Sequence, residues 1–489
     1  MREKKKREMF LSRETVEQEL TEENQSEKTE KISFENACSL IRKSMDARWR
    51  ATGDNEKRQQ LEREKRAIMG EPDAIDLFKS EIKRIIRELE IGEVAFPLWY
   101  KSLEDGIFAE LYGLSGLTPW VYDETEEYAR SSSAKLIGER LYCLIDGVSA
   151  LQPQRMSKDR REQLKRAVLM ATPRERLETG FHEVYLHNGI RLSIFSGERT
   201  KENQDVMVFR KYILKEFTLE KISSMGTFPV EAVPLFKSMV SLGFNVLFAG
   251  PVRSGKTSFL QAWQKCEDPS LEGLAISTDP EIPWHIVMPE APIMQIVADG
   301  EALESISKPI LRGDNDYILL EEMRDAVAYN IALEITSLGT RRSKGTIHTE
   351  DAAMLPYKMA TAIRNRYGGD LKGIMQQIFK NINYVFEFCQ LPHDRSKKKL
   401  VSISEYSYDD DLDRVSIHSI CKYDSKNDSW QWNYHIDERK VANNPNRREV
   451  EKMKTILENL KVTSPMVRNS VSHPRYYSGN SRGGMAENG

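Results

Sequence analysis

The segment from Asn245 to Leu260 reads NVLFAGPVRSGKTSFL and constrains the fold of this chain more than any other segment. Its residues follow the spacing G-x-x-x-x-G-K-[ST], which is typical of a loop that wraps around phosphate groups. The apolar run before the loop predicts a buried strand, and TSFLQAW after it predicts the start of a helix. At such a turn the main-chain N–H groups and the helix dipole both attract phosphates. We therefore expect a nucleotide to bind here.

Two residues of this loop have specific expected roles in binding a nucleotide and Mg²⁺. Lys256 is expected to reach the β- and γ-phosphates, and the hydroxyl of Thr257 is expected to ligate Mg²⁺. A loop that binds nothing is the alternative, but the position between a strand and a helix argues against it. The complete set of expected cofactor-binding residues in the loop is Gly250, Pro251, Val252, Arg253, Ser254, Gly255, Lys256, Thr257 and Ser258.

Short apolar segments alternate with helical ones after about residue 230. The apolar segments are FNVLFAG, GLAIST, IMQIVA, YILLEEM, GTIHT and INYVFEF. Brief, β-branched segments of this kind are typical of strands buried on both faces, and their alternation with helices predicts a mostly parallel sheet between two helical layers. The fold class is therefore α/β. Segments joined by polar turns after Leu391 predict additional antiparallel strands.

Changes in composition divide the chain into five expected regions. A charged, disordered tail is expected at 1–30, and a helical region at 31–100. A smaller α/β domain is expected at 101–229, where Asn188-Gly189 predicts a hairpin. A larger α/β domain that contains the phosphate loop is expected at 230–440, and a final helix with a disordered tail at 441–489.

Overall composition argues against several classes of protein. The chain has 72 Lys and Arg residues against 75 Asp and Glu residues, so it lacks the basic excess of a protein that mainly grips nucleic acid. No apolar run approaches the roughly 18 residues that a membrane span needs. The basic N-terminus has no apolar run behind it and is not a secretory signal. The five scattered cysteines predict reduced thiols in a cytoplasmic protein.

A carboxylate that could activate water is expected in YILLEEMRD, residues 317–325. Glu321 and Glu322 are adjacent on the expected strand, so their side chains face opposite ways and only one can point at the nucleotide. Carboxylates at the carboxyl end of a parallel strand lie beside the ligand crevice. Ordinary surface charge is the alternative interpretation of this pair.

Several segments together resemble the type II/type IV secretion ATPase superfamily. LRGDNDYILLEEMRDA resembles its Walker B region, GTIHTEDAA its histidine box and STDPE its aspartate box, in the family's order behind the phosphate loop. The resemblance covers roughly residues 105–425 and is closest to the Tad/Flp-pilus and conjugative branch. It implies a RecA-like P-loop NTPase domain preceded by a smaller α/β domain and a helical region.

The resemblance also implies roles for single residues. It makes Glu322 the catalytic carboxylate and His348 a sensor of the γ-phosphate, although a structural histidine is the alternative for His348. Arg324 is expected to contact phosphate or to pair with a neighbouring acid. Asp279 is expected as a metal ligand, and Glu281 as a catalytic or metal-water ligand.

Upstream, NGIRLSIFSG and VMVFRKY resemble the family's segment before the motor domain. On that match Arg191 and Arg210 are expected to contact nucleotide phosphates.

The sequence also departs from the family pattern. Val252-Arg253 replace a common Thr-Gly, Thr278 stands where Glu is usual, and Gly339-Thr340-Arg341-Arg342 replace Gly-His-x-Gly. These departures leave nucleotide binding credible and call the rate of hydrolysis into question. The run Lys397-Lys398-Lys399 is expected to be a solvated turn, or a place where an acidic partner docks.

The resemblance finally implies partners and a location. A homo-hexameric ring is expected to use ATP-driven domain motion on inner-membrane platform proteins, with membrane contact only through those partners. The expected location is cytoplasmic, at the inner face of the cell membrane. The alternative is a non-catalytic, nucleotide-gated assembly subunit of the same kind of machine. A nucleic-acid motor is disfavoured by the near-neutral charge, so no direct nucleic-acid contact is expected.

Overall fold

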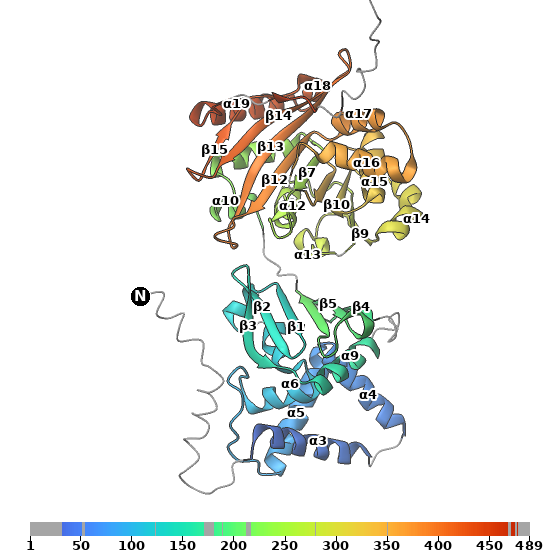
Figure 1. The fold of residues 1–489 in the computed structure, drawn as a ribbon, viewed down its shortest axis with the longest axis vertical. Coiled ribbons are helices and arrows are strands. Elements are labelled where there is room, and N and C mark those ends of the chain that lie inside the picture. Colours follow the sequence, from blue (N-terminus) through green and yellow to red (C-terminus); the bar gives the residue numbers. More distant parts are fainter. Residues whose placement is uncertain are drawn as a thin grey trace, which may run out of the picture. The chain divides into compact units, whose positions relative to one another are not determined.

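The structure, a computed structural model, describes residues 32–50, 54–122, 124–170, 180–187, 189–211, 217–278, 280–349, 351–467, 471–474 and 477. The chain forms two compact units, described here one at a time (Figure 1). The first unit is drawn from residues 1–145 and 149–213, and the second from 146–148 and 214–489. The N-terminal tail expected at 1–30 lies outside the described residues, and the division into five regions stays a prediction.

Helices form the N-terminal part of the first unit. They are α3 (Phe34–Arg50), α4 (Asp54–Ile68), α5 (Pro72–Glu88) and α6 (Leu103–Tyr112). Apolar residues of α5 recur at spacings of three and four, so Ile75, Phe78, Ile82 and Ile85 share one face and are buried. They pack in one cluster with residues of α3 and α6. This periodicity explains the small helical core.

A six-stranded sheet follows in the same unit. Its order is β3-β2-β1-β6-β5-β4. Short helices, α7 (Thr118–Val121) and α8 (Glu126–Arg130), precede it, and α9 (Lys158–Met170) lies between β3 and β4 in the chain. The strands are β1 (Ser133–Ile137), β2 (Arg140–Ile145), β3 (Val148–Arg155), β4 (Phe181–Tyr185), β5 (Arg191–Phe195) and β6 (Val206–Arg210). The hairpin expected from the sequence is β4–β5, which pair antiparallel. Gly189 supplies a φ of +77° in its turn, and Asn188 lies outside the described residues.

The second unit contains a larger sheet, whose order is β15-β14-β13-β12-β7-β11-β10-β8-β9, with β16 paired to β14. Neighbouring strands from β12 to β9 are parallel, and those from β12 to β15 are antiparallel. The strands are β7 (Val246–Ala249), β8 (Gly273–Ser277), β9 (Ile293–Val297), β10 (Tyr317–Met323), β11 (Lys344–Ile347), β12 (Tyr384–Gln390), β13 (Lys398–Asp409), β14 (Arg414–Asp424), β15 (Ser429–Trp432) and β16 (Val471–Ser472). The predicted α/β fold class is confirmed.

Helices cover both faces of the parallel part. Alternate residues of β7 belong to different cores: Val246 and Phe248 to one, Leu247 and Ala249 to the other. The first core includes residues of α10 (Leu219–Ser224), α11 (Val233–Ser241), α12 (Lys256–Gln264) and α19 (Arg447–Thr463). The second includes residues of α14 (Gly300–Leu311), α15 (Ala326–Ser337), α16 (Leu355–Tyr367) and α17 (Leu371–Asn381). Figure 1 shows α14 to α17 gathered on one side of this unit. Two short helices, α13 (Trp284–Val287) and α18 (Glu438–Val441), complete it.

The strand order places three functional segments at one edge of the sheet. β7 leads into the phosphate loop, β11 lies next to it and leads into His348, and β10 follows with the two glutamates. Because parallel strands end at the same edge, these segments converge there. Among the described residues, no helix combines the length and the apolar character needed to cross a bilayer.

Candidate active site

The phosphate loop has a backbone that few residues could adopt. Gly250, Arg253 and Gly255 have φ values of +146°, +65° and +95°. A Cβ atom on Gly250 would lie 2.2 Å from the carbonyl oxygen of Phe388 on β12, so only glycine fits there. When left-handed and right-handed backbone conformations alternate in this way, successive N–H groups point into one concave space, which suits an anion. Ser254 is buried between them.

Aromatic packing fixes the helix that follows the loop. Phe259 and Trp263 of α12 lie edge-on to Phe248 of β7, with ring centroids 5.1 and 5.7 Å away. Trp263 also packs against Phe386 of β12, with the two ring centroids 5.1 Å apart. Because α12 begins at Lys256, this cluster sets where the lysine and the N-terminal end of the helix lie.

Lys256 is the first residue of α12, and its side chain is buried against the loop that precedes the helix. Its Nζ donates to the carbonyl oxygens of Gly250 at 2.9 Å and Pro251 at 2.8 Å, and lies 3.4 Å from Nδ1 of His348. Burial lowers the pKa of Lys256 to about 8, while the charges of Glu322 and Glu281 act in the opposite direction. A bound phosphate would strengthen the charged form further.

Glu322 and His348 extend this contact into a connected chain. Nε2 of His348 lies 2.8 Å from Oε1 of Glu322, and Nη2 of Arg324 donates to Oε2 at 2.5 Å. Burial acts to raise the pKa of Glu322, but Arg324 and His348 outweigh it and hold that pKa below its ordinary value. Glu322 is therefore a carboxylate at neutral pH, as a general base must be.

The neighbouring glutamate has the opposite environment. Glu321 is only 4% exposed, and its Oε1 accepts a hydrogen bond of 2.6 Å from the indole Nε1 of Trp284. Burial raises the pKa of Glu321 to about 8. Because side chains alternate along β10, Glu322 points toward the loop and Glu321 points into the core. Trp284 was missed from the sequence, because no local pattern links it to a residue so far along the chain.

The other expected residues of this unit occupy different positions. Thr257 and Ser258 lie in the first turn of α12 and are partly buried, whereas Val252 is 63% exposed. Glu281 is partly buried and close enough to influence the pKa of Lys256 and of Arg324. Asp279 lies outside the described residues, so its role as a metal ligand stays a prediction. The Arg324 side chain is 49% exposed and forms the ion pair that was the alternative to phosphate contact.

Two expected arginines lie in the first unit. Arg191 of β5 and Arg210 of β6 are directly opposite each other on adjacent strands. Arg191 is buried, with Nε 3.4 Å from Oε1 of Glu183, and Arg210 is exposed. The structure brings the two arginines together, and their contact with phosphates stays a prediction.

The unusual loop before His348 has a structural function that the sequence did not reveal. Arg342 donates to Oε2 of Glu267 at 2.6 Å and to the carbonyl of Val240 at 3.0 Å. Lys344 donates to the other oxygen, Oε1, at 2.6 Å. The side chains of Lys344 and Glu267 are 0% and 1% exposed. This buried ionic cluster joins the segment after α12 to the start of β11. The one sequence feature that could have indicated this cluster is Lys344, a charged residue within an otherwise apolar strand.

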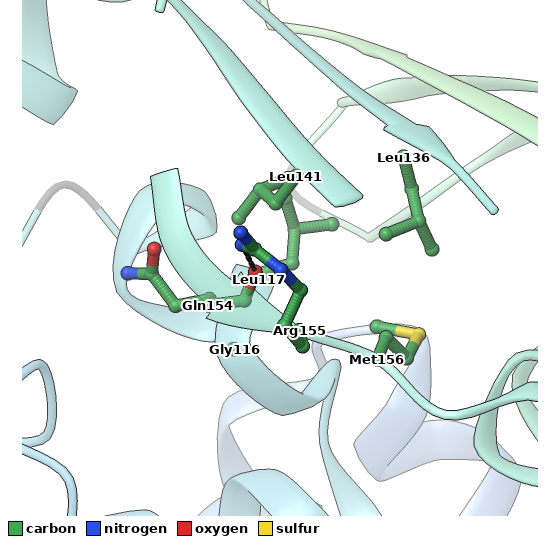
Figure 2. Close-up of a pocket in the computed structure, with 7 residues that line it drawn as sticks. All are labelled: Gly116, Leu117, Leu136, Leu141, Gln154, Arg155 and Met156. Atoms are coloured by element: carbon green, nitrogen blue, oxygen red, sulfur yellow. Dashed lines mark hydrogen bonds between the residues drawn. The ribbon is translucent and has the colours of Figure 1, made fainter. Parts of the chain in front are cut away.

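A hollow in the first unit has none of these features (Figure 2). Its lining residues are Gly116, Leu117, Leu136, Leu141, Gln154, Arg155 and Met156. The guanidinium of Arg155 turns back to main-chain carbonyls, including that of Gln154 at 2.8 Å. The hollow is apolar, unlike the phosphate loop with its buried lysine and neighbouring carboxylate.

The family model for type II/IV secretion system proteins matches residues 197–459, which is more than half of the chain. Competence protein ComGA of Bacillus subtilis (strain 168) is 28% identical over 157 residues, 30% of this chain and 42% of that protein. The chain therefore matches less than half the length of this relative.

Among solved structures, the VirB11 ATPase from the Brucella suis type IV secretion system is 18% identical, with a TM-score of 0.31, over 59% of this chain and 94% of that one. The Legionella pneumophila ATPase DotB is 15% identical, with a TM-score of 0.43, over 74% and 95%.

Proposed function

Because the chain belongs to the family of type II/IV secretion system proteins, we propose that it is an ATP-hydrolysing motor of such a machine. One observation carries this proposal: Glu322, His348 and Lys256 form a connected chain beside a glycine-rich loop at the carboxyl edge of a parallel sheet. Phosphate recognition and a carboxylate for water activation meet at this place.

Lys256, Glu322 and His348 have distinct roles in the proposed reaction. The loop backbone and Lys256 bind the β- and γ-phosphates and compensate the charge that develops on them. Glu322 orients the attacking water and accepts its proton. His348, which bridges Glu322 and Lys256, links the state of the carboxylate to that of the phosphate-binding lysine.

The oxygen donors of this site fit Mg²⁺. Thr257 offers a hydroxyl in the first turn of α12, and Glu281 a nearby carboxylate; hard oxygen ligands with retained waters are what Mg²⁺ prefers. When bound, Mg²⁺ would supply positive charge to the phosphates. Among the described residues, no group of three or more His, Cys, Asp or Glu side chains is placed to hold a metal ion.

We further propose the finer assignments that the family resemblance implied. They are a homo-hexameric ring, a cytoplasmic location at the inner face of the membrane, and force applied to inner-membrane platform proteins of a Tad/Flp-pilus or conjugation type. In this scheme nucleotide binding and hydrolysis change the angle between the domains.

A non-catalytic, nucleotide-gated assembly subunit is the second candidate. Arg341 and Arg342, which replace family residues before the histidine box, hold the carbonyls of Leu242 and Val240. They therefore serve the scaffold at the start of β11. In this candidate the loop binds ATP but turnover is negligible.

ATP hydrolysis by the purified full chain, measured over a range of protein concentrations with Mg²⁺, separates the candidates. The motor predicts a specific activity that rises with protein concentration as a ring assembles, and Lys256→Ala should abolish it. Tight ATP binding with no turnover at any concentration would contradict the motor and support the assembly subunit.

A further inference from the structure

Lys398 lies against the phosphate loop, although the lysine run that contains it was expected to be a solvated turn. It is the first residue of β13 and pairs with Gln390 of β12. A Cβ atom on Gly255 would lie 3.4 Å from Cγ of Lys398 and 3.6 Å from its Cβ. Since Gly255 is the N-cap of α12, the stem of Lys398 covers the residue next to Lys256. The solvated-turn interpretation is therefore wrong for this lysine.

The three lysines of the run have three different environments. Lys397 is exposed, and Lys399 is buried, paired with Asp428 and placed 5.1 Å from the ring of Trp430. Lys398 is partly buried and donates to the carbonyl oxygen of Arg395. Within the described part of the chain it belongs to no ion pair shorter than 4.0 Å. Its stem therefore lies against the loop, while its Nζ is bonded to a main-chain carbonyl and not to a carboxylate.

The loop itself carries a second cation, whose charge acts on Lys398. Arg253 is part of the loop and adopts a left-handed backbone with a φ of +65°. Burial lowers the pKa of Lys398, the charge of Arg253 lowers it further, and Asp394 opposes them. Two like charges near the positive end of a helix repel each other, and an anion between them would remove that cost.

The same loop also holds a buried hydroxyl group. Ser254 is 0% exposed, and its Oγ has no hydrogen-bond partner among the described residues. A buried hydroxyl normally has a partner. The paired cations, the helix N-terminus and this hydroxyl all favour an anionic ligand.

We propose that Lys398 and Arg253 form a second cationic arm of the nucleotide site, which binds the phosphates of a nucleoside di- or triphosphate from the side of the β12–β13 hairpin. The proposal rests on the proposed nucleotide-binding function and adds to it Lys398 and a side-chain role for Arg253, which the sequence already placed among the residues of the loop expected to bind the cofactor. Lys256 acts from within the loop, and Lys398 acts from a strand that lies about 140 residues further along the chain. The arm sets affinity for the phosphates, and Glu322 remains the group that activates water.

Calorimetric titration of the full chain with MgADP tests this arm. Lys398→Gln and Arg253→Gln should each weaken binding about tenfold, as expected for loss of one charge-assisted contact, and should reduce the salt dependence of binding. Lys397→Gln is the matched control, because it removes the same charge from the adjacent exposed position, and it should bind as the unaltered chain does. Inorganic phosphate and adenosine titrated separately show whether the phosphates alone are recognised.

Unfolding temperatures separate a binding role from a structural one. Without nucleotide, the Lys398→Gln variant should unfold at the same temperature as the unaltered chain or at a higher one, because repulsion between Lys398 and Arg253 is removed. Addition of MgADP should raise the unfolding temperature of the variant by less than it raises that of the unaltered chain. Lys398→Arg, which keeps the charge, should retain most of the affinity. Equal affinity of the Lys398→Gln and Lys397→Gln variants would overturn the proposal. Absence of nucleotide binding by the unaltered chain would instead overturn the proposed function.

Discussion

At the scale of single residues, the two adjacent glutamates show how position on a strand decides chemistry. Glu322 is held as a carboxylate by Arg324 and His348, whereas Glu321 is buried against Trp284. Strand alternation predicted from the sequence that the two face opposite ways. The sequence could not show which one is buried, because the partners come from distant segments.

The raised pKa of Glu321 predicts a pH-dependent stability. With a folded-state pKa of about 8 against an ordinary 4.5, Glu321 is protonated in the folded chain at pH 6 but ionised in the unfolded chain. The unfolded state therefore binds fewer protons, so the contribution of this group to stability falls as pH rises from about 4.5 to 8. Glu321→Gln should remove this loss, on the order of a few kcal/mol in total.

Chemical unfolding at pH 6 and pH 8 measures the effect. The free energy of unfolding should fall between these pH values by more in the unaltered chain than in Glu321→Gln. Glu304→Gln is the control, since Glu304 is a surface carboxylate whose pKa is held below its ordinary value by the bond from Arg366, so it is ionised throughout this range and should not change the pH dependence. An identical pH dependence in the unaltered chain and in Glu321→Gln would show that Glu321 is not protonated in the fold.

At the scale of secondary-structure elements, the site depends on how α12 and β11 are anchored. The N-terminal end of α12 carries Lys256, and β11 leads into His348. At the far end of both elements, Glu267 accepts from Lys344 and from Arg342. This buried cluster holds the two elements in register, so that the lysine and the histidine remain 3.4 Å apart.

Breaking this cluster from one side should be costly. Glu267→Gln leaves the ammonium of Lys344 buried without its carboxylate, which should lower the free energy of unfolding by about 3–5 kcal/mol. Lys344→Met added to Glu267→Gln should recover a large part of the loss, because the uncompensated charge is gone. Urea unfolding of the two single variants and the double variant measures the coupling. Strictly additive losses would contradict a direct ionic interaction.

At the scale of the whole molecule, the sequence predicted the parallel sheet and the phosphate loop because both depend on local patterns. The glycine spacing, the apolar strands and the alternation of β10 could all be recognised within short segments. The contact of Lys398 with the loop could not, since it arises from the order of strands. β12 lies beside β7, and β13 beside β12, although they are far apart in the chain. Because a lysine run is typical of solvated turns, composition predicted a solvated turn and not the contact of Lys398 with the loop.

In the proposed reaction, Glu322 activates water for hydrolysis of ATP bound at the loop. The most direct measurement is single-turnover conversion of bound ATP to ADP by the full chain, compared with Glu322→Gln under the same conditions with Mg²⁺. The variant should bind ATP with unchanged affinity and convert it at least about 100-fold more slowly, as expected for loss of a general base. Conversion at the unaltered rate by Glu322→Gln would show that Glu322 is not the group that activates water.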